Sequence, residues 1–313
     1  MERIALVGAP GAIGLAVAAE LERRGERYVA LSRSRARMEQ VFRTAKLARL
    51  APADLGTHRD AVEALRGVES VLYAVGVPYH QFDLHPKLMR AALEAAIEAG
   101  VRRMLVVSSV YSYGSPVTPR VTETHPREPK AFKGRMRREQ EDAALDAHKA
   151  GRLQTQIVRL PDFYGPGAEQ SLAHQIFRAA VRGVPANWLG PVDLPHEFIF
   201  VPDAAPVLID LLFRDDAYGE AWNLGGAGTI TGREFMTAAY EAAGAMPRWR
   251  TAGRLFLRVA GLFNATMREL VEMQYLQETP VILDDSRLSA LLGDLPKTPY
   301  AEGIRETVSW MRQ

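Results

Sequence analysis

One segment near the start of the chain constrains the fold more than any other. Ile4 to Val7 is a short apolar run, and residues 8–14 follow it with the sequence Gly-Ala-Pro-Gly-Ala-Ile-Gly. A stretch rich in Ala, Leu and Glu then runs to Arg24 and stops at Gly25. This order predicts a buried strand, a glycine turn and a helix that ends at a glycine. Such a turn lets backbone N–H groups approach a dinucleotide pyrophosphate at the positive end of the helix dipole.

The glycine spacing points to a family. Gly8, Gly11 and Gly14 stand three residues apart, which resembles the short-chain dehydrogenase/reductase superfamily. The resemblance implies an α/β fold, a Rossmann-type doubly wound parallel sheet with a smaller C-terminal substrate lobe. A glycine-rich turn without a ligand is the alternative, but the flanking strand and capped helix favour a nicotinamide dinucleotide. We expect pyrophosphate contacts from Gly8, Pro10, Gly11, Ala12, Ile13 and Gly14.

Composition excludes several other classes. The chain has 313 residues, 47% of them hydrophobic and 24% charged, which is ordinary for a globular enzyme. A net charge of +2 gives no basic surface for nucleic acid. No cysteine is present, and the 7 histidines show no metal-binding spacing. Because the first predicted strand begins at Ile4, we expect no signal peptide, and no apolar run approaches the length needed to cross a bilayer. We therefore expect a cytoplasmic protein, monomeric or homodimeric.

The residues after the second predicted strand bear on the choice of cofactor. This strand, Arg27 to Ser32, leads into Arg33-Ser34-Arg35, and no acid follows before Glu39. In this architecture an acid here binds the free 2′-hydroxyl of the adenosine ribose, whereas a cation accepts a 2′-phosphate. The sequence therefore favours NADP(H) over NAD(H), with Ser32, Arg33 and Arg35 as contacts. Solvated loop arginines without a ligand are the alternative.

Further cofactor contacts follow from the resemblance and from strand ends. Asp54-Leu55 resembles the family's adenine-contact position. The ends of later predicted strands should pass beside the cofactor, because open α/β sheets bind ligands at the carboxyl ends of their strands. These contacts are Asp54, Leu55, Ala74, Val75, Gly76, Ser108, Lys133 and Pro161.

The stretch after the fifth predicted strand resembles the extended branch of the superfamily. Ser109 stands four residues before Tyr113-Gly114, and in that branch a Ser or Thr so placed helps to hold the substrate carbonyl or hydroxyl. The resemblance thus implies a catalytic Ser109, with Tyr111 and Tyr113 beside the substrate. Serines that only end a strand and begin a turn are the alternative.

The catalytic segment departs from the extended branch. Its members carry Tyr-x-x-x-Lys, with the tyrosine as proton donor and acceptor, and this chain has no such motif. By position, Lys133 replaces the tyrosine and Arg137 the lysine. The pattern Lys-x-x-x-Arg-Arg-x-x-Glu, ending at Glu141, resembles the isoflavone reductase branch, which uses a lysine instead. Neighbouring cations at this helix start oppose the helix dipole and favour a neutral amine, which suits acid–base catalysis at Lys133. A solvated basic face is the alternative.

A later motif marks the exit to the substrate lobe. Arg159 and the Tyr-Gly-Pro beginning at Tyr164 form a pattern typical of the extended branch, and Asp162 and Phe163 lie between them. Sugar-nucleotide members commonly carry asparagine at the position of Asp162, where it contacts the diphosphate, and an aspartate would repel that group. The expected substrate contacts are Tyr111, Tyr113, Asp162, Phe163 and Tyr164.

These observations lead to one domain division and three functional hypotheses. We expect a Rossmann domain over 1–160 and about 196–226, and a substrate lobe over about 161–195 and 227–313. The first hypothesis is an NAD(P)H-dependent oxidoreductase that acts on a small, apolar carbonyl or alcohol, with Ser109, Lys133 and Arg137 as catalytic residues. An epimerase or dehydratase with bound NAD(P) is the second. A non-catalytic redox sensor that binds NADP(H) is the third.

Overall fold

A parallel sheet forms the centre of the molecule. The computed structural model describes residues 3–169, 171–252, 272 and 274–313. Its largest sheet has seven strands in the order β10-β6-β5-β4-β1-β2-β3, and every pair is parallel. The strands are β1 (Ile4–Val7), β2 (Tyr28–Ser32), β3 (Ala48–Pro52), β4 (Ser70–Tyr73), β5 (Arg103–Ser109), β6 (Gln154–Leu160) and β10 (Ala221–Asn223). The predicted Rossmann-type α/β class is confirmed.

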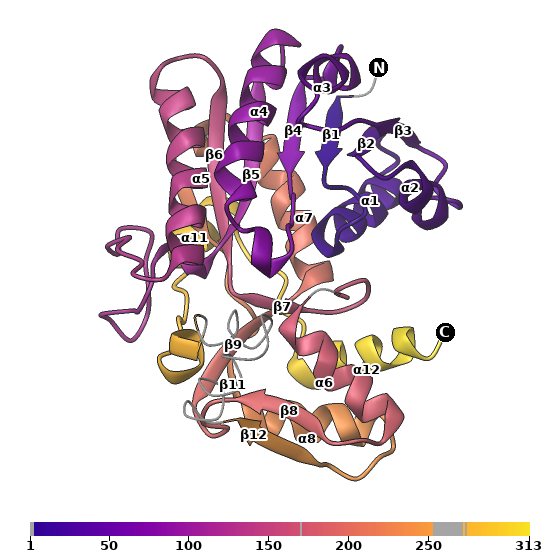
Figure 1. Cartoon of the computed structure of the whole chain (residues 1–313), viewed down its shortest axis with the longest axis vertical. Helices are drawn as coiled ribbons and strands as arrows, with labels where there is room; N and C mark the ends of the chain where they lie inside the picture. Colours follow the sequence, from indigo (N-terminus) through magenta and orange to yellow (C-terminus); the bar gives the residue numbers. More distant parts are fainter. Residues whose placement is uncertain (1–2, 170, 253–271, 273) are drawn as a thin grey trace.

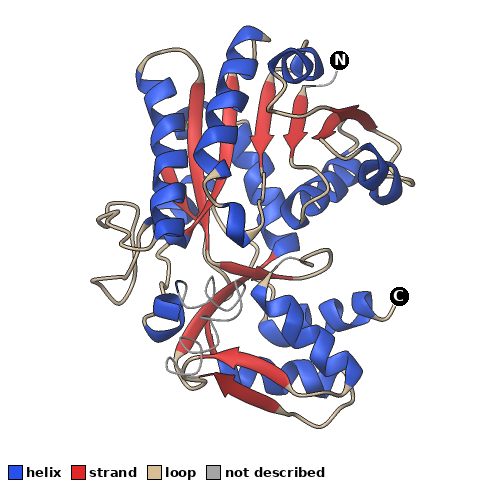
Figure 2. Ribbon diagram, in the orientation of Figure 1, coloured by secondary structure: helices blue, strands red, loops and turns tan. Residues whose placement is uncertain are grey.

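Helices cover both faces of this sheet (Figures 1 and 2). On one face, Leu6 of β1 and Leu72 of β4 share a buried cluster with side chains of α1 and α7. On the other, Val7 and Tyr73 pack with side chains of α3, α4 and α5. Successive residues of a strand face opposite sides, so both faces of these apolar strands are buried. The helices are α1 (Ala12–Arg24), α2 (Arg35–Val41), α3 (His58–Leu65), α4 (Leu84–Glu98), α5 (Phe132–Lys149) and α7 (Val201–Leu212).

A smaller layer of structure lies at the carboxyl end of the main sheet (Figure 1). It contains a three-stranded sheet in the order β11-β9-β7 and a parallel pair, β12-β8. Aromatic rings of Tyr164, Phe177 and Phe235 pack together in its core. The elements are β7 (Asp162–Tyr164), β8 (Ala186–Leu189), β9 (Pro195–Phe200), β11 (Thr229–Thr231), β12 (Trp249–Ala252), α6 (Leu172–Arg182), α8 (Gly232–Ala242) and α12 (Tyr300–Met311).

The remaining described elements are short. Three single-turn helices are η1 (Tyr79–Gln81), η2 (Val110–Ser112) and η3 (Asp215–Ala217), and α11 spans Ser286–Leu292. Leu288 of α11 packs in the main-sheet core, although the predicted division placed 227–313 in the substrate lobe. Part of that predicted lobe, residues 253–271 and 273, lies outside the described residues. Among the described residues, no helix combines the length and apolarity that crossing a bilayer requires.

Candidate active site

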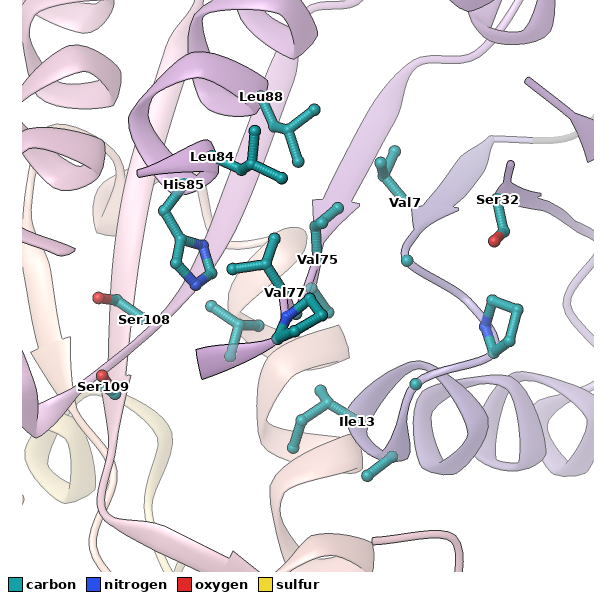
Figure 3. Close-up of a pocket in the computed structure, with 18 of the residues that line it drawn as sticks. Val7, Ile13, Ser32, Val75, Val77, Leu84, His85, Leu88, Ser108 and Ser109 are labelled. Atoms are coloured by element: carbon teal, nitrogen blue, oxygen red, sulfur yellow. The ribbon is translucent and has the colours of Figure 1, made fainter. Parts of the chain in front are cut away.

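A cavity of about 450 Å³ runs along the carboxyl edge of the main sheet. It extends from the glycine turn after β1, past the ends of β2 and β4, to Ser109 at the end of β5 and Asp162 in β7. In Figure 3 Val7 and Ser32 lie at one end of this cavity and Ser108 and Ser109 at the other. The cavity therefore spans the point where strand order reverses between β1 and β4, which is where open α/β sheets bind ligands.

The glycine turn lines the cavity through five of its six predicted residues. Gly8, Pro10, Gly11, Ala12 and Ile13 lie in the lining, and Gly14 does not. A Cβ on Gly14 would lie 2.5 Å from the carbonyl oxygen of Ala9, so this glycine lets α1 pack closely behind the turn. Gly8 has φ +89°, and a Cβ there would lie 2.7 Å from the carbonyl oxygen of Ala74. Both positions require glycine to shape the turn.

At the β2 end, one predicted arginine lies in the lining and the other does not. Ser32 and Arg33 line the cavity, as do Asp54 and Leu55. Arg35 is exposed and pairs with Glu39 at 3.6 Å, away from the cavity. Its role as a cofactor contact is not supported by this position.

A neighbouring arginine that the sequence analysis did not single out does line the cavity. Arg37 lines the cavity and its guanidinium lies 3.2 Å from Glu169. Ser34 caps α2, with its hydroxyl accepting the Arg37 N–H at 3.3 Å. Residues two apart on a helix point in nearly opposite directions, so only one of Arg35 and Arg37 can face the cavity. The Ser cap at Ser34 was the available signal.

The middle of the cavity combines predicted backbone contacts with an apolar wall from α4. Ala74, Val75, Gly76, Ser108 and Pro161 line it as expected. Figure 3 shows Leu84, His85 and Leu88 of α4 directed toward the same space as Val75 and Val77. The sequence analysis assigned no site role to this first turn of α4.

His85 is the one titratable side chain of this wall. It is fully buried, and neither ring nitrogen has a hydrogen-bond partner within the described part of the chain. Its ring packs edge-on against Phe82 with centroids 4.8 Å apart. Burial lowers the pKa of His85 to about 2, with a smaller contribution from the charge of Arg137. The imidazole is therefore neutral and offers the cavity one donor and one acceptor.

The β5 end of the cavity gathers polar groups from five elements. Ser109, Tyr79 of η1, Tyr111 of η2, Asp162 of β7 and Arg137 of α5 all line it. The Tyr111 hydroxyl donates to Asp162 Oδ1 at 3.3 Å, and the hydroxyls of Tyr79 and Tyr111 are 3.3 Å apart. Ser109 Oγ and Arg137 Nε have no hydrogen-bond partner among the described residues. These groups can hold and protonate a substrate oxygen.

Burial perturbs the ionisation of these groups. It raises the pKa of Asp162 to about 6, partly offset by the hydrogen bond from Tyr111. Burial also raises the pKa of Tyr111 well above its ordinary value and lowers that of Arg137. Removal from water disfavours the charged form of each group. Asp162 is thus a carboxyl that exchanges a proton close to neutral pH.

Lys133, the predicted proton donor, is not among the residues that line the cavity. It is fully buried, and its Nζ lies 2.8 Å from Glu272 Oε2. Its backbone N–H also donates to Glu272 Oε1 at 2.8 Å. The Nζ lies 6.0 Å and 5.8 Å from the ring centroids of Tyr79 and Phe82, which do line the cavity. The role predicted for Lys133 in catalysis and cofactor binding stays a prediction.

Of the other predicted substrate residues, Phe163 lines the cavity and Tyr113 and Tyr164 do not. The Tyr113 hydroxyl donates to Asn223 Oδ1 and accepts from Arg159, both at 2.8 Å. Tyr164 is buried in the aromatic core of the small layer. Neither tyrosine lies in the cavity lining, and the substrate contacts predicted for them stay a prediction.

A buried carboxylate fixes the end of β5. Glu141 of α5 accepts a 2.6 Å hydrogen bond from Ser108 and a 2.8 Å ion pair from Arg159 of β6. Burial by itself would raise the pKa of Glu141, but the guanidiniums of Arg159 and Arg127 and the Ser108 hydroxyl hold it below its usual value. The network ties α5, β5 and β6 together beside Ser109.

A seven-stranded Rossmann-type sheet with a cavity at its switch point is the architecture of dinucleotide-binding enzymes. The model of the NAD dependent epimerase/dehydratase family matches residues 4–225. The chain belongs to this family.

Two curated relatives carry different activities. A dTDP-glucose 4,6-dehydratase of Streptomyces griseus is 25% identical over 219 residues, 70% of this chain and 61% of that protein. A 2′-dehydrokanamycin reductase of Streptomyces kanamyceticus is 27% identical over 288 residues, 88% of this chain and 74% of that protein. The match to the dehydratase thus spans about three fifths of that protein's length.

Solved structures share the fold over nearly the whole chain. The DesIV double mutant of Streptomyces venezuelae, a dTDP-glucose 4,6-dehydratase with NAD and DAU bound, has a TM-score of 0.83 at 20% identity, covering 99% of this chain and 97% of that one. A UDP-glucuronic acid 4-epimerase of Bacillus cereus with UDP-glucuronic acid and NAD also has a TM-score of 0.83, at 16% identity and 99% and 98% coverage. None of these proteins is described as an isoflavone reductase, so that detail stays a prediction.

Proposed function

We propose that this protein is an NADP(H)-dependent oxidoreductase that reduces a small carbonyl compound or oxidises the corresponding alcohol. The observation that carries the proposal is the cavity itself, which joins the glycine turn to the polar group around Ser109. When bound, the nicotinamide supplies or accepts the hydride. The 27% identical reductase adds support from a relative of the same reaction type.

The residues that line the cavity fit a dinucleotide and a small substrate. A volume of about 450 Å³ is within the range of ligand pockets. Three polar groups along it, on His85, Ser109 and Arg137, have atoms without a hydrogen-bond partner among the described residues. Buried polar atoms are normally hydrogen-bonded, so a ligand that supplies partners accounts for them.

Each region of the cavity takes one task in this proposal. Backbone N–H groups of the Gly8–Gly14 turn hold the pyrophosphate at the start of α1. The guanidiniums of Arg33 and Arg37 donate hydrogen bonds to the 2′-phosphate. Ser109 donates a hydrogen bond to the reacting oxygen, and Arg137 holds the substrate or ribose beside it. The apolar wall of α4 excludes water and favours an apolar substrate.

An epimerase or dehydratase is the second candidate, favoured by the dTDP-glucose 4,6-dehydratase relatives. Asp162 weighs against it, because a carboxylate at the cavity wall would repel the diphosphate of a sugar nucleotide. A cofactor retained through purification, together with a thermal shift by dTDP-glucose, would favour this candidate. Cofactor binding without turnover of any carbonyl would favour the redox-sensor hypothesis.

The cofactor preference is directly measurable. We expect NADPH to bind at least tenfold more tightly than NADH, about 1.4 kcal/mol, because two guanidiniums face the adenosine end of the cavity. Titration of cofactor fluorescence gives both dissociation constants. Arg33→Ala and Arg37→Ala should each weaken NADPH and leave NADH unchanged.

Arg43→Ala is the matched control for these variants. Arg43 is exposed just after α2 and does not line the cavity, so its removal changes the net charge equally. The control should bind both cofactors as the parent does. Equal affinities of the parent for NADPH and NADH would exclude the assigned role of the two arginines.

A further inference from the structure

The β5 end of the cavity raises the question of which group protonates the substrate oxygen. The chain has no Tyr-x-x-x-Lys motif, and Lys133 is paired with Glu272 outside the cavity lining. Arg137 lines the cavity, but a guanidinium keeps its proton and acts as a hydrogen-bond donor only. Ser109 can donate a hydrogen bond to the oxygen but has no base beside it, since Ser109 Oγ has no partner among the described residues.

Two side chains of the lining form a connected proton path. The Tyr111 hydroxyl and the Asp162 carboxyl both line the cavity and are joined by the 3.3 Å hydrogen bond. Tyr111 comes two residues after Ser109, in the single-turn helix η2 that follows β5. Asp162 begins β7, and no ion pair of its carboxylate occurs among the described residues. A buried carboxyl without a cation is suited to take up a proton.

We propose that Tyr111 is the proton donor to the substrate oxygen and that Asp162 supplies Tyr111 with the proton. This inference rests on the proposed oxidoreductase function. Tyr111 would touch the substrate and Asp162 would act through it. The pair thereby replaces the catalytic tyrosine of the Tyr-x-x-x-Lys motif, which this chain lacks.

The step balances in the direction of reduction. With a reduced nicotinamide bound, its hydride would go to the carbonyl carbon, and the C=O π electrons would move onto the oxygen. That oxygen takes the proton of the Tyr111 hydroxyl, whose O–H bond breaks. Tyr111 then regains a proton from the Asp162 carboxylic acid, which becomes a carboxylate and is reprotonated by solvent. Alcohol oxidation runs through the same transfers in reverse, with NADP⁺ as the oxidant.

The ionisation of Asp162 sets the direction of the Tyr111 hydroxyl. Burial raises the pKa of Asp162 to about 6. Below this pH the acid donates to the tyrosine oxygen, and the phenolic O–H is free to point at the substrate. Above it the carboxylate accepts the phenolic proton, which favours removal of a proton from an alcohol. Reduction should therefore slow, and oxidation accelerate, as the pH rises through about 6.

Other ionisable groups surround this pair. Tyr79 contacts Tyr111, and Arg137 also lines the cavity. Burial raises the pKa of Tyr275, and the negative charges of Glu272 and Asp162 raise it further. A small neighbouring cavity is lined by Asp162 together with His196 and Glu197 of β9. Burial raises the pKa of Glu197 to about 7 and lowers that of His196 to about 4.

The first test is kinetic. Single-turnover oxidation of NADPH with a panel of small carbonyls is followed from about pH 5 to pH 8, which brackets the expected inflection. Tyr111→Phe should slow hydride transfer by about a hundredfold, the usual effect of losing a placed acid, with NADPH affinity unchanged. Asp162→Asn should slow it and abolish the inflection, since the amide does not titrate.

Tyr275→Phe is the matched control. Tyr275 is a half-buried tyrosine close to Asp162 that does not line the cavity, and its buried hydroxyl has no hydrogen-bond partner among the described residues. This variant should keep the parental rate and pH profile. Parental turnover in Tyr111→Phe would overturn the assignment of the donor. A slow Asp162→Asn variant that keeps the parental inflection would overturn the role of Asp162.

The second test needs no substrate. Infrared difference spectra of the protein during a pH titration report the carboxylic C=O band of a protonated aspartate. The parent should show such a group ionising near pH 6, and Asp162→Asn should lack it. In Tyr111→Phe the midpoint should rise, because the hydrogen bond that stabilises the carboxylate is lost.

The two tests separate this inference from the proposed function. An unchanged midpoint in Tyr111→Phe, or no carboxyl titrating near pH 6 in the parent, would overturn the coupling between the two side chains. If the coupled titration is observed and the parent reduces no carbonyl, the oxidoreductase proposal fails while the proton-sharing pair stands.

Discussion

At the scale of single residues, burial keeps the imidazole of His85 neutral in the wall of the cavity. Its imidazole is fully buried, lines the cavity and has no partner within the described ranges. A neutral imidazole can pair with a ribose hydroxyl or a carboxamide, each of which both donates and accepts. Because the folded protein keeps this residue uncharged, its free energy of unfolding should decrease in acid.

The stability contribution of His85 should depend on pH. Its pKa is lowered to about 2 in the folded protein, whereas an unfolded histidine titrates at about 6.5. Because the folded pKa is the lower one, the contribution is complete above pH 6.5 and decreases as the pH falls below it. Between about pH 6.5 and pH 5 the parent should lose about 2 kcal/mol that His85→Leu does not lose. Urea unfolding at several pH values measures the difference.

Exposed His80 supplies the control for this measurement. His80→Leu, five residues earlier on the surface, should keep the full acid sensitivity of the parent. If His85→Leu and the parent lose stability in parallel between these pH values, the imidazole of His85 is protonated in the folded protein and does not stay neutral.

Sequence could identify many cavity residues, and the misses have a physical cause. Contacts defined by backbone position, such as Gly8, Gly11 and Val75, lie where the sequence predicted. Contacts that depend on the direction of a side chain were harder to predict. Choosing Arg37 rather than Arg35 requires the phase of a helix, and sequence alone leaves that phase open.

At the scale of elements, β1, β2 and β4 were predictable because each is a short, mostly apolar run buried on both faces. The helix α2 was missed. It has seven residues and begins with Arg-Ala-Arg. Met38 is its single buried side chain. Such a segment has no amphipathic periodicity to detect, and its formation depends on the Ser34 cap and on packing.

The Glu141 carboxylate contributes to the contact between α5 and β6, and its removal should be costly. Glu141→Gln keeps the shape of the side chain but leaves the guanidinium of Arg159, 2% exposed, without its counter-charge. Loss of one partner of a buried ion pair typically costs about 3–5 kcal/mol, and we expect a decrease of that size in the free energy of unfolding. Urea unfolding measures it.

A neighbouring pair provides the comparison. Asp142→Asn removes an exposed partner of Arg127, and exposed pairs contribute at most about 1 kcal/mol. Similar losses in both variants would mean that the buried position of Glu141 confers no special stability.

At the scale of the whole molecule, Lys133 joins parts of the chain that are far apart in sequence. It lies in the first turn of α5 and pairs with Glu272, 139 residues later. The sequence pattern predicted that this lysine is the catalytic acid. The structure offers a different expectation, that the lysine connects the Rossmann part of the chain to its C-terminal part. Sequence could not reveal the pairing, because nothing in the pattern around Lys133 identifies so distant a partner.

Replacement of Lys133 by methionine decides between these expectations. Methionine keeps the aliphatic stem and removes the ammonium. If the residue is structural, Lys133→Met should lower the free energy of unfolding by about 1–3 kcal/mol, less than for a fully buried pair because Glu272 is 26% exposed and keeps its backbone hydrogen bond. Turnover should stay within about threefold of the parent, whereas loss of an acid–base group costs a hundredfold or more. Lys130→Met, at an exposed position just before the helix, should change neither quantity. A hundredfold loss of turnover at unchanged stability would instead make Lys133 the acid and remove that role from Tyr111.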